Sequence, residues 1–212
     1  MAQPINVVVD LSHHNPSVDF EKLKAAGIVG VIHKATQGLG FVDKQYAKRR
    51  QPALDAGLLW GAYHFGVGGD GSDQADFFLD TVGTDPQTLL VLDYEPNHPG
   101  PTMTLDQARE FVEHTNNVAG RFPGLYSGHL IKEQLGGAAP DPLLSKCFLW
   151  IAQYKGPQPL GIPATFKTWT FWQYSDGTHG PKPHAIDGVT GSCDRNLFNG
   201  SVAQLKKLWG VA

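Results

Sequence analysis

Cysteine, long apolar segments and basic blocks are all scarce in this sequence. Its 212 residues include only two cysteines, Cys147 and Cys193, which are too few for a disulfide scaffold and lack metal-site spacing. Both flank late predicted strands, which leaves a disulfide between them open. No apolar stretch reaches the ~20 residues of a membrane-spanning helix, and residues 1–4 lack the basic and apolar regions of an export signal. We therefore expect no membrane partner.

Positive charge is also limited. Lys plus Arg number 17 against 20 Asp plus Glu, which gives a net charge of −3, and the longest basic run is Lys48-Arg49-Arg50. Proteins that bind nucleic acids neutralise phosphates with clustered basic side chains. We therefore expect no nucleic-acid partner, and we expect binding to depend on specific contacts more than on charge.

Short apolar segments bounded by Gly and Pro recur along the chain, a pattern typical of β-strands. The second, fourth and sixth are almost continuously apolar, as expected for parallel strands that are buried on both faces. The eight predicted strands are 5–10, 28–33, 58–65, 88–94, 122–127, 147–153, 169–174 and 193–198.

Helix signals occupy the spacers between most of the early strands. The clearest helix is 104–119, which begins with a capping box formed by Thr104 and Gln107 and ends at Gly120. Pro52 predicts a kink in the second helix. The other predicted helices are 19–26, 43–56, 72–82, 129–135 and, after the last strand, 201–209.

The late spacers are different, because 155–163 and 175–192 are too rich in Gly and Pro for a helix of normal length. The chain therefore predicts an α/β fold, a TIM-like (βα)5(β)3 barrel with an incomplete helical coat, as a single domain over residues 1–212. A complete eight-unit barrel typically takes ~250 residues.

Four carboxylates stand near predicted strand ends, where barrels of this type carry their active sites. They are Asp10, Asp93, Glu95 and Asp194. Asp93 and Glu95 are two positions apart after an apolar run, so on a strand they face the same side with Cα atoms roughly 6.5–7 Å apart. Two acids so close disfavour joint ionisation, an arrangement that can hydrolyse a glycosidic bond. A divalent-metal site shared by the pair and a solvated strand end are the alternatives.

The segment 66–71 also satisfies the G-x-G-x-x-G pattern of dinucleotide-binding proteins, with Asp93 at a suitable distance. However, Asp70 and Asp73 place negative charge where a pyrophosphate would lie. We expect a flexible rim loop instead, and neither a cofactor nor a metal ion. For His13 and His14, a structural or substrate-contacting role is favoured over metal binding.

Seven short motifs then follow one another along nearly the whole chain. They are Asp10-Leu-Ser-His-His-Asn15, Ile32-His-Lys-Ala-Thr-Gln-Gly38, Gly61-Ala-Tyr-His-Phe65, Leu92-Asp-Tyr-Glu95, Leu149-Trp-Ile-Ala152, Trp172-Gln-Tyr174 and Asp194-Arg-Asn-Leu-Phe198. Together they resemble the glycoside hydrolase family 25 lysozymes. The resemblance implies a barrel of five βα units followed by three strands. It also implies cleavage of the β-1,4 bond between N-acetylmuramic acid and N-acetylglucosamine in peptidoglycan.

The resemblance assigns roles to individual residues. It implies that Glu95 is the general acid, that Asp93 is its partner carboxylate, and that Asp10 and Asp194 are the other catalytic-site acids. The family usually has Glu at the position of Gln37 and an apolar residue at that of His33. Residues expected to bind substrate are Lys34, Tyr63, Phe65, Tyr126, Trp150, Gln173 and Tyr174.

The resemblance also sets expectations for the whole protein. The partner is the glycan strand of peptidoglycan, the protein is a monomer, and it acts at the bacterial cell wall, outside the producing cell or after release from a host cell. The alternatives are a non-catalytic barrel that binds wall glycan and a chitinase-type glycosidase. The pattern D-x-x-D-x-D-x-E of the latter would require Asp where Val91 stands.

Overall fold

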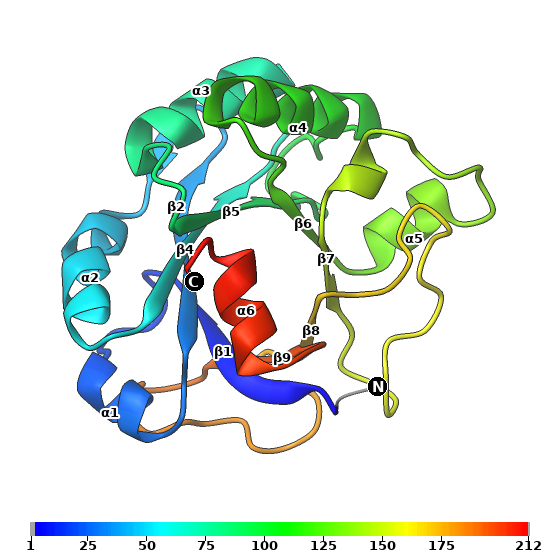
Figure 1. Ribbon diagram of the computed structural model, residues 1–212. Coiled ribbons are helices and arrows are strands. Elements are labelled where there is room, and N and C mark those ends of the chain that lie inside the picture. Colours follow the sequence, from blue (N-terminus) through cyan, green and yellow to red (C-terminus); the bar gives the residue numbers. More distant parts are fainter. Residues whose placement is uncertain (1–2, 212) are drawn as a thin grey trace.

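The barrel is closed by a ring of strands, each paired with the next. The computed structural model describes residues 3–211, which form a nine-stranded sheet with the order β1-β9-β8-β7-β6-β5-β4-β2-β3, and β2 also pairs with β1. The eight predicted strands therefore close on themselves, and the predicted TIM-like barrel is confirmed (Figure 1). The strands are β1 Ile5–Leu11, β2 Gly30–Gln37, β3 Phe41–Val42, β4 Leu59–Phe65, β5 Thr88–Asp93, β6 Gly124–Ser127, β7 Leu149–Ala152, β8 Phe171–Ser175 and β9 Asp194–Phe198.

The helices begin and end close to the predicted positions. Both capping boxes are present, at Thr104 with Gln107 and at Ser201 with Gln204. Pro52 lies inside the second helix, which continues to Asp55. The helices are α1 Phe20–Ala25, α2 Lys44–Asp55, α3 Gly71–Val82, α4 Leu105–Ala119, α5 His129–Leu135 and α6 Val202–Leu208, with a 3-10 turn at Leu144–Lys146.

β9 differs from the other barrel strands in its direction. It runs antiparallel to both β1 and β8, whereas the remaining neighbours in the barrel are parallel. Residues 176–192 contain no helix to carry the chain back along the barrel, so β9 starts at the end where β8 finishes. Asp194 therefore reaches the same rim as Asp10 from the start of a strand, not from its end, and the two residues are register partners.

β2 extends four residues beyond its predicted end. The polar side chains of Lys34, Thr36 and Gln37 interrupt the apolar pattern, but these residues pair with β4, and Thr36 and Gln37 also pair with β3. β3 was not predicted, because it has only two residues. The turn between β2 and β3 includes Gly38, whose φ of +52° favours glycine.

Side chains inside the barrel form one apolar cluster, and those between the strands and the outer helices form another. The inner cluster includes Val8, Ile32, Val91 and Phe171. Trp209, which follows α6, closes this cluster at the end of the barrel where the parallel strands begin. Figure 1 looks onto this end, with α6 in front of the strands. The open, functional end of the barrel is therefore the opposite one, where the parallel strands finish.

The two cysteines lie at opposite ends of the barrel and do not form a disulfide with each other. Cys147 precedes β7 at the end covered by α6, whereas Cys193 precedes the antiparallel β9 at the rim. Both are free and buried. Burial raises the pKa of the Cys147 thiol to about 12 and that of Cys193 further still.

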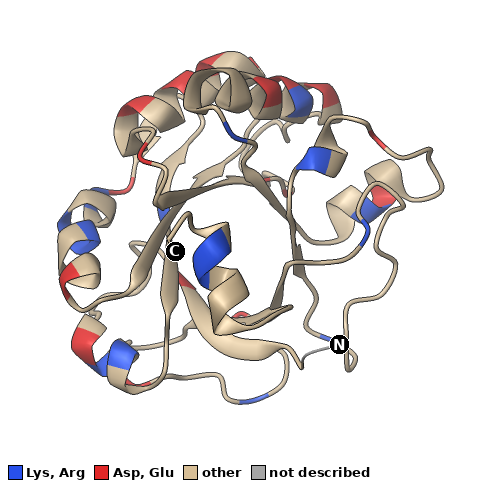
Figure 2. Cartoon of the chain, in the orientation of Figure 1, with Lys and Arg blue, Asp and Glu red and all other residues tan. Residues whose placement is uncertain are grey.

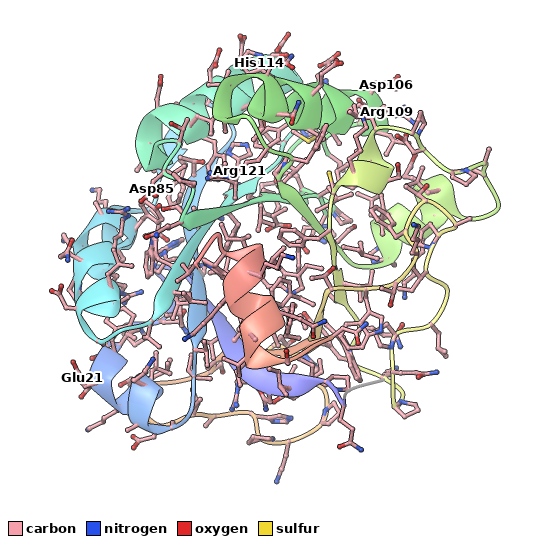
Figure 3. The ribbon with its side chains drawn as sticks, in the orientation of Figure 1. Glu21, Asp85, Asp106, Arg109, His114 and Arg121 are labelled. Atoms are coloured by element: carbon pink, nitrogen blue, oxygen red, sulfur yellow. The ribbon has the colours of Figure 1, made fainter. Side chains whose placement is uncertain are left out.

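Acidic side chains are concentrated on the outside of α3 and α4, which are rimmed with red in Figure 2. Some of them are paired: His114 contacts Asp76 across the two helices at 2.6 Å, and Arg109 Nη1 donates to Asp106 within α4. Figure 3 labels Arg109 and His114 along α4. No helix within residues 3–211 is long and apolar enough to cross a membrane.

Candidate active site

A cavity of about 210 Å³ opens at the rim where the parallel strands end. All four predicted carboxylates line it, together with three tyrosines, a tryptophan and a glutamine. Its lining is Asp10, Tyr63, Asp93, Glu95, Tyr126, Trp150, Tyr154, Gln173 and Asp194. The cavity thus unites residues from the first strand of the barrel to the last.

Asp93 and Glu95 form the acidic pair at the end of β5. Asp93 is the last residue of the strand and is 6% exposed, while Glu95 lies two residues beyond it and is half-buried. Burial and the neighbouring Glu95 raise the pKa of Asp93 well above its ordinary value, and burial also raises the pKa of Glu95. Two carboxyls in this environment do not both ionise readily, so the pair retains a proton toward neutral pH.

One oxygen of this pair has no protein partner. Asp93 Oδ1 is buried and makes no hydrogen bond to any residue from 3 to 211. A buried polar oxygen without a partner is unfavourable, which is typical of an atom that meets a ligand. The Asp93 carboxyl, which lines the cavity, therefore keeps hydrogen-bonding capacity that residues 3–211 do not use.

Asp10 and Asp194 form a second acidic pair across β1 and β9. Burial raises the pKa of both, and the charge of Asp10 helps to raise that of Asp194 to about 9. Asp10 is held in place by Asn196 Nδ2, which donates to it at 2.8 Å, and by Gln173 Nε2 at 3.2 Å. These donors favour a charged Asp10, and a protonated Asp194 beside it.

A chain of neutral hydrogen bonds fixes Asp10 from the opposite wall. The hydroxyls of Tyr126 and Tyr154 both donate to Gln173 Oε1, at 2.8 and 2.7 Å. Trp150 Nε1 donates to Asn196 Oδ1 at 2.8 Å on the other side. The Asp10 carboxylate is thereby oriented by side chains from three further strands.

Lys34 supplies positive charge near the Asp93–Glu95 pair without lining the cavity. Its Nζ donates to Gln37 Oε1 at 2.7 Å and lies 5.0 Å from the centre of the Phe65 ring. Burial lowers the pKa of Lys34, and the attraction of Asp93 opposes that effect. Lys34 in turn lowers the pKa values of Asp93 and Glu95.

The structure therefore brings most of the predicted site residues together, with three exceptions. Lys34 and Phe65 are not among the residues that line the cavity, and Tyr174 belongs to the outer apolar cluster, where its hydroxyl accepts from Asn6 Nδ2 at 2.7 Å. Adjacent strand residues point to opposite faces, so Gln173 inside the barrel places Tyr174 outside it. The same rule could have found Asn196, which was not predicted and which stands two residues after Asp194.

Backbone hydrogen bonds connect the glycine-rich segment 66–71 to neighbouring parts of the chain. Gly66 N donates to Asp93 O at 2.9 Å and Gly68 N to Pro101 O at 2.7 Å. A Cβ at Gly68 would lie 2.5 Å from Pro101 Cβ, so close packing explains this glycine. The Asp70 side chain itself caps α3 by accepting from Asp73 N. The segment is therefore a rim loop with backbone hydrogen bonds to Asp93 and Pro101, its flexibility stays a prediction, and the helix end has an acidic cap where a phosphate would bind.

No group of three or more His, Cys, Asp or Glu side chains within residues 3–211 is arranged to hold a metal ion. Asp10 instead accepts hydrogen bonds from the side-chain amides of Asn196 and Gln173. The chemistry available at the rim is therefore that of carboxyl groups with shifted pKa values, which can donate and accept protons.

Comparison with known proteins gives a consistent result. Residues 9–182 match the model of the family described as Glycosyl hydrolases family 25. Lysozyme M1 of Streptomyces globisporus is 31% identical over 94% of this chain and 70% of that protein. The N,O-diacetylmuramidase of Chalaropsis sp is 29% identical over 94% of this chain and 96% of that protein.

Solved structures agree with these relatives. A bacterial lysozyme from Streptomyces coelicolor superposes with a TM-score of 0.84 at 31% identity and covers 98% of this chain and 99% of that one. A family GH25 lysozyme from Aspergillus fumigatus has a TM-score of 0.80 at 34% identity and covers 97% and 99%. The chain belongs to glycosyl hydrolase family 25 and is a glycoside hydrolase.

Proposed function

We propose that this protein is a lysozyme with N-acetylmuramidase activity, which hydrolyses the β-1,4 bond between N-acetylmuramic acid and N-acetylglucosamine in peptidoglycan. The observation that carries the proposal is the Asp93–Glu95 pair, two carboxyls with raised pKa values in one rim cavity. The relatives named lysozyme and N,O-diacetylmuramidase support this choice of substrate. The protein acts as a single domain and a monomer at the bacterial cell wall.

In the proposed mechanism, Glu95 is the general acid. Its proton passes to the glycosidic oxygen as the bond between that oxygen and the anomeric carbon breaks. The oxygen of the sugar's own 2-acetamido group forms a new bond to the anomeric carbon on the opposite face. The acetamido N–H donates a hydrogen bond to Asp93, which favours the ionised form of that carboxyl and leaves the proton of the pair on Glu95, and the ionised Asp93 then stabilises the positive charge that develops.

Water then completes the reaction. Glu95, now ionised, removes a proton from a water molecule that attacks the anomeric carbon, and the acetamido oxygen leaves. Two inversions give net retention of configuration. Asp10 and Asp194 line the same cavity and orient the sugar, assisted by Tyr63, Tyr126 and Gln173. Direct attack by an activated water would invert the configuration instead.

The variant Glu95→Gln tests the role of the general acid. An amide has nearly the same shape but carries no acidic proton, so we expect cell-wall hydrolysis to fall by about 10²- to 10⁴-fold. The rate is measured as the loss of turbidity of purified walls, with thermal unfolding as the check on folding. Glu133→Gln, at an exposed position of α5, is the control. Substantial activity in Glu95→Gln would place the acid elsewhere.

The fragments identify the bond and the stereochemistry. Mass spectrometry after reduction should find muramic acid at the new reducing ends; glucosamine there would indicate the other glycosidic bond or a chitinase-type specificity. Intact walls would indicate a barrel that only binds glycan. The anomer first released, observed by NMR, should be β, and an α product would contradict retention.

A further inference from the structure

A second and larger groove continues from the catalytic cavity. It encloses about 770 Å³ and shares Glu95, Tyr126 and Tyr154 with the cavity. Its other walls come from the start of α5, from the end of β7 with the segment that follows, and from the connection between β8 and β9. The remaining lining is Gly128, His129, Lys132, Ala152, Gln153, Lys155, His179 and Gly180. A substrate cleaved at Glu95 therefore has direct access to this groove.

The groove has a concentration of basic groups that is unusual for a chain of net charge −3. Lys132, Lys155, His129 and His179 all line it, and Glu95 is its one acidic residue. Within residues 3–211, no carboxylate lies within 4.0 Å of the side-chain nitrogens of Lys132, Lys155 or His129, whereas His179 contacts Asp176 at 2.8 Å. Two lysine charges thus face the groove without an acidic partner in the protein.

Gln153 holds the lysine-bearing segments together. Its Oε1 accepts from Lys132 Nζ at 2.8 Å and from Leu160 N at 3.1 Å, and its Nε2 donates to Lys155 O at 2.8 Å. α5 and the segment after β7 are therefore joined by one half-buried amide. Because the segments are already ordered, an anion that binds there loses less free energy to their immobilisation.

We propose that this groove binds the carboxylates of the peptide attached to the lactyl group of muramic acid. The inference rests on the proposed muramidase function. N-acetylglucosamine is uncharged, and in a peptide-bearing strand the lactyl carboxyl of muramic acid is part of the amide bond to the peptide, so the glycan of such a strand gives these lysines no carboxylate to pair with. The peptide next to the cleaved bond carries free carboxylates, which form charge-assisted hydrogen bonds with lysine. The groove is large enough for several residues of such a peptide, whereas the catalytic cavity is not.

The experiment compares two soluble, uncrosslinked glycan substrates that lack wall phosphates. One bears its peptides, and the other has been stripped of them by an amidase. Lys132→Gln/Lys155→Gln removes both groove charges. Lys48→Gln/Lys207→Gln removes two exposed charges from α2 and α6, outside the groove, as the matched control. Thermal midpoints verify that each variant is folded.

The readout is the ratio of KM for the stripped substrate to KM for the peptide-bearing one. We expect a ratio of about ten for the wild type and the control, as two charged hydrogen bonds can supply. In the groove variant the ratio should fall to near one, mainly through a higher KM for the peptide-bearing substrate, with little change in kcat.

Three results would overturn the inference. They are a wild-type ratio near one, a groove variant that keeps the wild-type ratio, and a groove variant that loses activity equally on both substrates. A fourth result would also overturn it: if the wild type preferred the stripped substrate and the groove variant lost that preference, the groove would be assigned to the lactyl carboxylate. If the wild type cleaved neither substrate, the proposed muramidase function would itself fail.

Discussion

At the scale of single residues, the reactivity of the rim depends on how burial and charge are balanced. Asp93 is more buried than Glu95. Neighbouring carboxylates raise the pKa values of both residues, whereas the ammonium of Lys34 lowers them. A general acid works best when its pKa lies near the working pH. For Glu95, the proposed general acid, burial raises the pKa and the nearby ammonium of Lys34 lowers it.

Lys34→Met tests this balance. Loss of the ammonium removes an effect that lowers the pKa values of both Asp93 and Glu95, so both should rise. Because the general acid then stays protonated to higher pH, the alkaline limb of the profile of kcat/KM against pH should move upward. Lys44→Met, at an exposed position of α2, is the control. An alkaline limb that stays in place would show that Lys34 does not act on the acid.

At the scale of elements, α6 closes the end of the barrel opposite the active site. Trp209, which ends this helix, is fully buried, donates from Nε1 to Trp60 O at 2.8 Å and lies 5.9 Å from the Phe171 ring. Gly30 leaves room for the indole, since a Cβ there would lie 3.4 Å from it. The helix therefore serves as the floor of the barrel core.

Trp209→Ala should lower the free energy of unfolding by about 3–5 kcal/mol, because it leaves a cavity at the centre of the floor. Denaturant or thermal unfolding measures the change. Val202→Ala, which shortens an exposed residue at the start of the same helix, should cost less than about 1 kcal/mol. Equal losses for the two variants would contradict the role given to the indole.

The glycine-rich connection between β4 and α3 gives a second test at this scale. Gly68→Ala would press a methyl group onto Pro101, in the segment that follows Glu95, and we expect destabilisation of about 1–3 kcal/mol together with a lower rate of wall hydrolysis. Gly40→Ala is the matched control, because its Cβ would meet no atom within 4 Å. Activity and stability equal to those of the control would show that the contact is not needed.

At the scale of the whole molecule, two histidines are buried between the barrel and its outer helices. His64 contacts Thr36 Oγ1 through Nδ1 at 2.8 Å and Gln74 Oε1 through Nε2 at 3.2 Å. His33 contacts Lys34 O and Arg49 through its two ring nitrogens. Burial lowers the pKa of each histidine to about 4. Both rings are therefore neutral at physiological pH.

These rings should make the fold sensitive to acid. The unfolded chain takes up a proton on each histidine below about pH 6.5, but the folded chain does so only near pH 4. The free energy of unfolding therefore decreases as the pH is lowered through that window. When the pH is lowered from about 7.5 to about 5, the free energy of unfolding should decrease in both proteins through His33, but the decrease should be about 2 kcal/mol smaller in His64→Gln than in the wild type.

The difference between the two proteins is the readout, because the carboxyls with raised pKa values act in the opposite direction over the same range in both. Exposed His98, replaced by Gln, is the control and should keep the wild-type dependence on pH. A parallel pair of curves for wild type and His64→Gln would show that His64 does not carry this effect.

The order of strands and helices follows from the sequence alone. Capping boxes such as Thr104 with Gln107, apolar runs such as 89–92 and glycines after helices all act over a few residues, so a local pattern is enough to find them. Asp10, Asp93 and Glu95 were found in the same way, because parallel strands bring their ends to one rim, whereas the place of Asp194 at that rim depends on the direction of β9. The absence of helices from the two late connections, 155–163 and 175–192, is also evident from their Gly and Pro content.

Only the tertiary structure decided what depends on distant residues. It set the direction of β9, which places Asp194 against Asp10. It turned Tyr174 away from the cavity and brought Asn196 to Asp10. It also joined Lys132 to Lys155 through Gln153 in one groove. Burial, proton sharing and uncompensated charge arise only when the barrel closes, because they depend on neighbours far away in the sequence and on the exclusion of water.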